Sequence, residues 1–337
     1  MKVGEKKVKK IFLVLLSCIL LVGCGNYSSK NASKDLENKI NNLKSYNLTG
    51  VLEITSNEDI YKYDVDVSYK KNDNFRVSLK NQTNNHEQII LKNEDGVYVL
   101  TPSLNKSFKF QSDWPYNNSQ TYLLQTLLDD INKDNNKKFT QTKNSYIFKT
   151  KVNYPNNQDL TKQKIYFDKK LNPQKVEVLD NKNNILIKMT FNGIKYNPKF
   201  KKKYFELEEN MNVSLTEETN KKVSKINEDI YPMYIPEKTK LASRDIVNTK
   251  DGKRVIMNYE GENSFMFVEE TAKKDSELEI VSVYGDPCQI ASSVAAISDN
   301  MITWVANDNI YYVVSDNMSE QQLVSVASSV SVIPVSK

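Results

Sequence analysis

The residue types that could carry nucleophilic or metal chemistry are scarce in this sequence, which has one histidine, His86, and three cysteines. A Ser-His-Asp triad, a Cys-His pair and a zinc site all need an imidazole or several thiols close together. His86 stands among polar residues at the edge of an expected strand, where a solvated side chain is the usual outcome. Asp64 and Asp66 lie two residues apart on the polar face of a strand, where we expect solvated carboxylates without a catalytic partner. We therefore predict that the protein is not an enzyme and has no catalytic residue, metal or cofactor.

Glycine and charge patterns exclude two further functions. The nine glycines are too scattered to form a G-x-G-x-x-G turn or a Walker loop, so neither route to nucleotide binding is open. The chain has 47 basic and 42 acidic side chains, of which five lysines and one glutamate fall within the first ten residues, leaving 42 and 41 in the remainder. Because nucleic-acid binding needs a surplus of positive charge, we predict no nucleic-acid partner.

The N-terminus has the pattern of a secretory leader. Lysines up to Lys10 precede an apolar run from Ile11 to Val22 that only Ser17 interrupts. As a helix this run spans about 18 Å, well short of the roughly 30 Å hydrocarbon core of a bilayer. The following Leu21-Val22-Gly23-Cys24 resembles the bacterial lipobox, whose cysteine receives diacylglycerol and becomes the new N-terminus. We predict that residues 1–23 are a lipoprotein signal peptide, with an ordinary leader and a chance cysteine as the alternative.

Lipidation of Cys24 determines the expected location. Two or three acyl chains, such as palmitate, make attachment to a bilayer effectively permanent. We expect an extracytoplasmic protein at the outer face of the cell membrane, with residues 24–32 as a tether. Cys18 leaves with the leader, so no intrachain disulfide is expected. The remaining thiol, Cys288, has no histidine near it in the sequence and is expected to be inert.

Two apolar periodicities organise residues 33–209. Leu36, Ile40 and Leu43 have helical spacing, and the leucine-rich stretch from Ser119 to Lys133 predicts a second helix capped by Ser119. Elsewhere apolar and polar residues alternate as in half-buried antiparallel strands. We predict an α+β fold in which helices cover one large curved antiparallel sheet, arranged as a meander. The expected strands span residues 61–70, 75–79, 88–93, 97–100, 108–110, 146–152, 164–168, 175–179 and 185–191.

The concave face of this sheet is the candidate ligand site. Its large apolar side chains either fill a close-packed core, which is the more common case, or line a cavity. The candidate cavity-lining residues are Tyr63, Val65, Val67, Phe75, Val77 and Phe191.

Residues 210–230 are charged, lack apolar periodicity and predict a linker. Residues 231–337 then predict a smaller α+β domain. It opens with Tyr231-Pro232 and Ile235-Pro236, turns a hairpin at Asp251-Gly252 and ends with a helix capped by Ser319. Its expected strands span residues 255–259, 264–269, 278–284, 301–306 and 310–315.

The order of these elements resembles a known fold. A helix, long antiparallel strands, a leucine-rich helix and further strands end in Lys164-Ile165-Tyr166-Phe167-Asp168, then Leu171-Asn172-Pro173 and Phe191. This order is similar to the LolA/LolB-type lipoprotein-carrier fold, which also occurs in YdcC-type sporulation and GerS-type germination lipoproteins of spore formers and in RseB-type regulators. Pro232 to Pro236, Ile302-Thr303-Trp304 and the terminal helix are similar to the C-terminal domains of the YdcC and RseB groups.

The resemblance implies function by binding, and the likeness to proteins of spore formers implies that the membrane is that of the cell, the forespore or the spore. The first hypothesis is a membrane-anchored, non-catalytic lipoprotein that binds a protein partner in envelope or spore assembly or in germination; a GerS-type role implies assistance to a cortex-modifying amidase. The alternative is a carrier or sensor that holds a lipid or lipopeptide on the apolar concave face, although an anchor at Cys24 argues against a soluble shuttle. A homodimer is left open.

Overall fold

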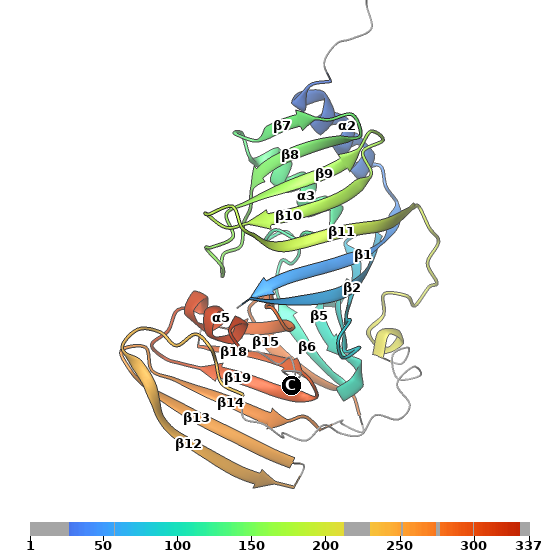
Figure 1. Ribbon diagram of the computed structural model, residues 1–337. Coiled ribbons are helices and arrows are strands. Elements are labelled where there is room, and N and C mark those ends of the chain that lie inside the picture. Colours follow the sequence, from blue (N-terminus) through green and yellow to red (C-terminus); the bar gives the residue numbers. More distant parts are fainter. Residues whose placement is uncertain are drawn as a thin grey trace, which may run out of the picture.

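The computed structural model describes residues 27–56, 58–211, 230–250, 252–273, 277–298 and 300–330. These residues contain one sheet of twelve strands and one of seven. Helices α2 (Ser29–Asn41) and α3 (Leu124–Lys133) lie with the larger sheet, and α5 (Glu320–Ser328) lies with the smaller one (Figure 1). The predicted α+β class, with a large curved sheet and a smaller C-terminal part, is confirmed.

All neighbouring strands of the larger sheet pair in antiparallel fashion except the parallel pair at one edge. Its strands are β1 (Ser45–Ser56), β2 (Asp59–Lys70), β3 (Asn74–Asn81), β4 (Glu87–Asn93), β5 (Gly96–Thr101), β6 (Lys106–Gln111), β7 (Lys138–Gln141), β8 (Ser145–Lys151), β9 (Lys162–Asp168), β10 (Pro173–Leu179), β11 (Ile185–Tyr196) and β15 (Glu279–Tyr284). In space they follow the order β15-β6-β5-β4-β3-β2-β1-β11-β10-β9-β8-β7.

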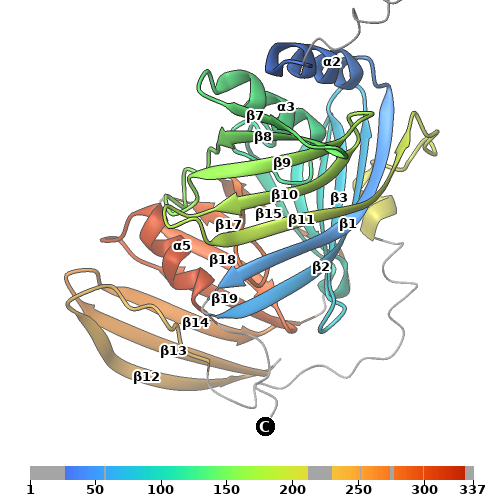
Figure 2. The same cartoon turned by 45° about the horizontal axis from the view of Figure 1, so that its top comes forward.

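The expected meander forms in two runs, β2 to β6 and β7 to β11. Strand β1 joins these runs because it pairs with β2 on one side and β11 on the other. It is not among the expected strands, although Tyr46, Leu48, Leu52 and Ile54 are buried at alternate positions along it. The largest sheet is therefore built around a strand near the start of the chain (Figure 2).

Helix α2 confirms the first expected helix and begins at Ser29, seven residues before Leu36. The Ser28 hydroxyl caps it by accepting a hydrogen bond from the Asn31 amide at 3.2 Å. Ala32, Leu36 and Ile40 are buried on its inner side, in the same apolar core as Leu127 and Ile131 of α3. Both helices thus cover the face of the sheet that carries the buried side chains.

The prediction that Ser119 caps the second helix is wrong, because α3 begins at Leu124 and its N-cap position is Leu123. The Ser119 hydroxyl has other partners. It donates to Asp130 Oδ1 at 3.0 Å and accepts from the Asn153 amide at 2.9 Å. The residues before α3 therefore form a loop that is tied to the β8–β9 connection rather than a first helical turn.

The smaller sheet has the order β12-β13-β14-β19-β18-β17-β16. The Ser319 side chain caps α5 beside this sheet, as predicted, and Gln322 completes a capping box with it. The strands of the smaller sheet are β12 (Thr239–Thr249), β13 (Gly252–Gly261), β14 (Phe265–Thr271), β16 (Pro287–Gln289), β17 (Val294–Ser298), β18 (Met301–Ala306) and β19 (Asn309–Val314).

The two parts of the chain are interlocked. The expected strand over residues 278–284 forms as β15, but it pairs in parallel with β6 and extends the larger sheet. One apolar core also includes side chains from both parts, among them Val65, Phe167, Ile290 and Leu323. The division of the chain into domains at residues 210–230 stays a prediction, and residues 212–229 lie outside the described part.

Candidate binding pocket between the two sheets

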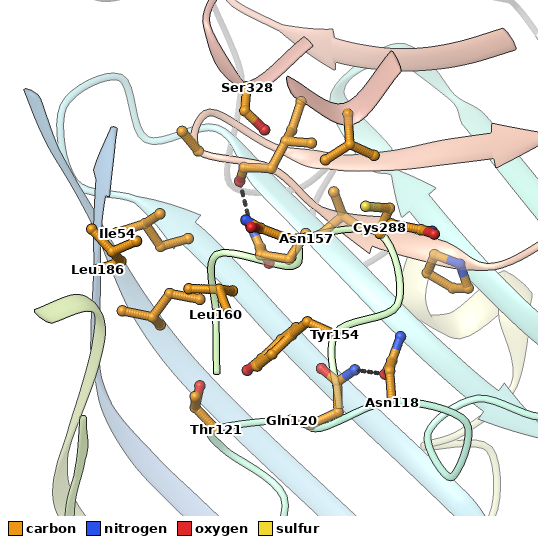
Figure 3. A pocket seen from close by; sticks show the side chains of 18 of the residues that line it. Ile54, Asn118, Gln120, Thr121, Tyr154, Asn157, Leu160, Leu186, Cys288 and Ser328 are labelled. Carbon is orange, nitrogen blue, oxygen red and sulfur yellow. Dashed lines mark hydrogen bonds between the residues drawn. The ribbon is translucent and has the colours of Figure 1, made fainter. Parts of the chain in front are cut away.

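A pocket of about 120 Å³ lies where the concave side of the larger sheet meets the C-terminal part. That volume equals roughly four water molecules of liquid, or a short segment of an apolar chain. Its walls come from β1, β11, the loops before α3 and between β8 and β9, the segment after β15 and α5. Figure 3 shows Leu160, Leu186 and Ile54 on the apolar side and Asn118, Gln120 and Thr121 on a polar rim.

The two loops that line the pocket are fixed to each other by a polar network. Asn153 accepts a hydrogen bond from the Ser119 amide at 2.8 Å, and its side chain donates to the Asn117 carbonyl at 2.8 Å. Asp130 on α3 stands behind this network, accepting from Ser119 and from Gln163 Nε2 at 2.6 Å. Burial raises the pKa of Asp130 to about 6. The charge of this carboxyl, which supports the two loops, therefore changes near neutral pH.

The titratable side chains that line the pocket are held in their neutral forms. They are Tyr122, Tyr154 and Cys288. Burial raises the pKa of both tyrosines far above neutrality and raises the pKa of the Cys288 thiol to about 12. A protonated thiol is a poor nucleophile, so the lining favours binding of a neutral or apolar group over covalent chemistry.

Hydrogen bonds across the junction fix the walls of the pocket. Tyr63 donates to the Ala291 carbonyl at 2.7 Å, and Ser56 donates to the Ser328 carbonyl at 2.9 Å. Gln88, which is buried on β4, accepts from the Ser293 hydroxyl at 2.9 Å and the Val294 amide at 2.8 Å. Satisfied polar groups in an apolar junction specify one arrangement of the two parts.

The six residues predicted to line a cavity lie in the core beside this pocket. Tyr63, Val65, Val67, Phe75 and Val77 are at most 3% exposed, whereas Phe191 is partly buried. None of them is among the residues that line the pocket, although Tyr63 contacts its wall through Ala291. Their role in ligand binding stays a prediction. The polar loops that do line the pocket have no periodicity, so nothing in the sequence singles them out.

The other candidate residues lie apart from the pocket. His86 Nε2 is 2.9 Å from Asp308 Oδ1, across the junction between the two parts. Asp64 accepts a hydrogen bond from Gln82 at 2.7 Å, and Asp66 accepts one from Asn47 at 3.0 Å. Cys24 lies outside the described residues. Within the described ranges, no three His, Cys, Asp or Glu side chains gather as a metal site would require, and no helix is long and apolar enough to span a membrane.

A second candidate site is an exposed apolar area on the smaller sheet. Strand β12 is its edge strand and pairs on one side with β13. Leu241 is 41% exposed, and Met233, in the segment that leads into β12, is 71% exposed. Within the described part of the chain no strand pairs with the other edge of β12, and exposed apolar side chains beside such an edge are a common template for protein association. We call these residues the β12 surface: Tyr231, Met233, Tyr234, Ile235, Leu241, Ile246 and Val247.

The fold defines the class of the protein as a large curved, mainly antiparallel sheet covered by helices and joined to a smaller α+β part. The chain belongs to the family of YdcC-like sporulation proteins, whose sequence profile matches residues 6–205. It is 36% identical over 330 residues to the sporulation protein YdcC of Bacillus subtilis strain 168, and this alignment covers 96% of the present chain and 98% of that protein. Family membership places it among sporulation-associated proteins.

Two solved structures have similar folds at low sequence identity. One is the MucA/MucB complex of Pseudomonas aeruginosa, with 10% identity, a TM-score of 0.33 and coverage of 89% of this chain and 98% of the matched chain. The other is the CwlD amidase of Clostridioides difficile in complex with the GerS lipoprotein, with 16% identity, a TM-score of 0.21 and coverage of 53% of this chain and 99% of the matched chain.

Proposed function

We propose that this protein is a lipoprotein anchored through Cys24 at the outer face of a membrane of the sporulating cell, where it binds a protein partner without catalysing a reaction. The lipobox-like Leu21-Val22-Gly23-Cys24 supports the anchor. The neutral pocket lining supports binding rather than catalysis.

The observation that carries partner binding is the β12 surface. A monomeric protein rarely leaves several large apolar side chains exposed together. β12 is eleven residues long and lies at the edge of its sheet, so a strand from a partner can pair with it while apolar side chains on both sides of the strand pack against that partner.

The anchor is tested by metabolic labelling with a fatty-acid analogue. The wild-type protein is expected to incorporate label and to fractionate with membranes, and Cys24→Ala is expected to lose both properties. If Cys24→Ala still incorporates label and still fractionates with membranes, Cys24 is not the residue that attaches the protein to the membrane.

Partner binding is tested by replacing exposed residues in a strain that lacks the gene. Leu241→Asp and Ile246→Asp should reduce spore formation while the amount of protein, its membrane fractionation and its unfolding midpoint stay unchanged, because both side chains are exposed. Ile60→Asp is the matched control, since Ile60 is 53% exposed on the larger sheet. Equal spore formation in all three variants would contradict a role for the β12 surface.

The pocket supports a second candidate function, the binding of a lipid or lipopeptide. Its walls combine apolar side chains with a few polar groups on one rim, as small-molecule sites do. Leu160→Trp would fill the space, since Leu160 is 7% exposed at its wall. A fluorescent long-chain fatty acid, of which only the end of the chain would occupy this volume, should bind the wild type and not this variant. Equal binding by both, or no binding by the wild type, would remove this candidate.

A further inference from the structure

Charge is distributed very unevenly along the mature chain. Residues 137–175 contain ten lysines and two aspartates, and the whole sequence beyond the first ten residues contains 42 basic and 41 acidic side chains. The excess of eight positive charges in this segment is therefore offset by an excess of seven negative charges elsewhere. The segment comprises β7, β8, β9 and the loops around them, which form one end of the larger sheet.

Lysines face one another across these strands. Lys138 pairs with Lys149, and Lys149 pairs with Lys164. Lys151 pairs with Lys162 one step further along β8. Directly paired residues of neighbouring strands share a face, and so do residues two apart in one strand, so all five lysines lie on the same face of the sheet. We call them the lysine ladder.

The lysine ladder lies on the face opposite the apolar core. Phe148 and Ile165, which alternate with these lysines along β8 and β9, are fully buried. Lys138, Lys149 and Lys151 are exposed, and Lys162 and Lys164 are partly exposed. None of the five forms an ion pair with an acidic residue of the described ranges.

The line of cross-strand pairs that contains Lys149 and Lys164 continues toward the centre of the sheet, where the charges of its residues differ. Beyond Lys164 it continues through Glu177, Lys188, Glu53 and Lys62, each opposite the next. There the charges alternate, and Glu53 forms ion pairs with Lys188 at 3.0 Å and with Lys62 at 3.9 Å. Opposite charges on facing residues stabilise a sheet, whereas like charges destabilise it. The lysine ladder thus costs stability that the neighbouring strands avoid.

The ladder lies at the end of the larger sheet from which the chain leaves for Cys24, and Tyr146, which Tyr27 contacts there, is on the opposite face of β8 together with Phe148. The ring of Tyr27 is 4.7 Å from the ring of Tyr146 on β8, and Lys169 stands over that ring at 4.0 Å. Cys24 is three positions before Tyr27, a span of at most about 11 Å. The β12 surface is at the opposite end (Figure 1).

We propose that the lysine ladder docks the larger sheet on anionic lipid headgroups of the membrane that holds the anchor. This step rests on the proposed anchor for its orientation. A partner with a single acidic group would need only one or two lysines to bind it. A bilayer presents a continuous layer of negative charge, which matches a two-dimensional array of lysines. The β12 surface, at the other end of the molecule, takes no part in this contact and stays available to a partner (Figure 1).

The test uses the whole mature chain without its acyl groups, so that it does not depend on the anchor. The chain from residue 24 onward, carrying Cys24→Ser, is sedimented with vesicles of phosphatidylcholine that contain phosphatidylglycerol and with vesicles of phosphatidylcholine alone. The wild-type surface should bind only the anionic vesicles, and salt should weaken this binding.

Removing three ladder charges gives the decisive comparison. The triple variant Lys138→Gln, Lys149→Gln and Lys164→Gln should lower binding to anionic vesicles on the order of 100-fold, since each lysine near a charged bilayer contributes a factor of about five. Lys238→Gln, Lys240→Gln and Lys250→Gln remove the same charge from the far end of the molecule and should leave binding unchanged. Equal binding by the two triple variants, or binding of the wild type to both kinds of vesicle, would overturn the proposal.

Lys149→Glu separates docking from a structural role. The new carboxylate would face Lys138 and Lys164, so the unfolding midpoint should rise by about 1–3 °C while vesicle binding falls. A lower midpoint with unchanged vesicle binding would show that the ladder is structural. Binding of the wild type to a soluble anionic polymer but not to anionic vesicles would contradict the membrane as its partner. Loss of the anchor in Cys24→Ala alone would leave all these results unaffected.

Discussion

Asp130 shows how a single buried carboxyl connects the core to the pocket. It lies behind the loops that line the pocket and accepts hydrogen bonds from Ser119 and Gln163. Burial raises its pKa from 3.8 to about 6. The folded protein therefore holds a proton on this group over a pH range in which the unfolded chain has released it.

The sign of the resulting pH dependence follows from that shift. The stabilisation from protonated Asp130 is complete below about pH 4 and is lost as the pH rises through about 6. Asp130→Asn cannot ionise, so its free energy of unfolding should improve relative to the wild type by up to about 3 kcal/mol between pH 4 and pH 7.5. Urea unfolding of both proteins at the two pH values measures this change. If the difference in unfolding free energy between the variant and the wild type is the same at both pH values, the raised pKa of Asp130 is contradicted.

The chemical state of single residues was predictable where the sequence contains few residues of the reactive types. One histidine and three cysteines leave few catalytic arrangements, and Cys288 is held protonated, in line with the expected inert thiol. The partners of His86 were not predictable. Asp308 is more than two hundred residues away in the chain, and only the docking of the two parts brings these side chains together.

At the scale of elements, alternation along the sequence predicts strands but not their neighbours. β2 and β3 bury every second residue against the core, so their pattern is clear in the sequence. β17 is buried on both sides and shows no alternation, and it is absent from the expected strands. β15 was expected as a strand, but its pairing with β6 depends on the path of the whole chain.

Replacement of Gly50 tests how closely β1 packs against β11, where the two halves of the larger sheet join. The register between β1 and β11 shifts at Thr49 and Gly50, and a Cβ atom at Gly50 would collide with the Thr190 carbonyl and lie 2.5 Å from the Met189 side chain. Gly50→Ala should cost about 3 kcal/mol of unfolding free energy, because neither β11 nor the core has room to move.

Gly193 is the matched control on the facing strand. A Cβ atom there would lie 3.9 Å from Thr49 Oγ1, an ordinary contact, so Gly193→Ala should change stability by no more than about 0.5 kcal/mol. Equal losses in the two variants would show that glycine itself, rather than the close approach at Gly50, is what the sheet requires.

At the scale of the whole molecule, the two parts are bound to each other more extensively than the sequence indicates. The charged residues 210–230 predict a linker, whereas β15 extends the first sheet and Gln88 is buried against Ser293 and Val294 of the second part. The positions of β15 and of the junction residues follow from three-dimensional packing, for which the sequence carries no local pattern.

Limited proteolysis should therefore give a cut chain that stays assembled. We expect first cleavage within residues 210–230, where the sequence is charged and aperiodic, and we expect the two fragments to elute together until a denaturant is added. Gln88→Ala leaves the buried Val294 amide without its acceptor and should let the cut fragments separate at a lower denaturant concentration. Fragments that separate in buffer alone would contradict an interlocked junction.

The central claim is that the anchored protein binds a partner through the β12 surface. The most direct test is site-specific photo-crosslinking in sporulating cells, with benzoylphenylalanine placed at Leu241 in the membrane-attached chain and at Ile60 as the control. The account predicts one discrete crosslinked protein at Leu241 that disappears when Ile246→Asp is added, and no such species at Ile60. The same crosslinked species at both positions, or none at Leu241 at any stage of sporulation, would contradict it.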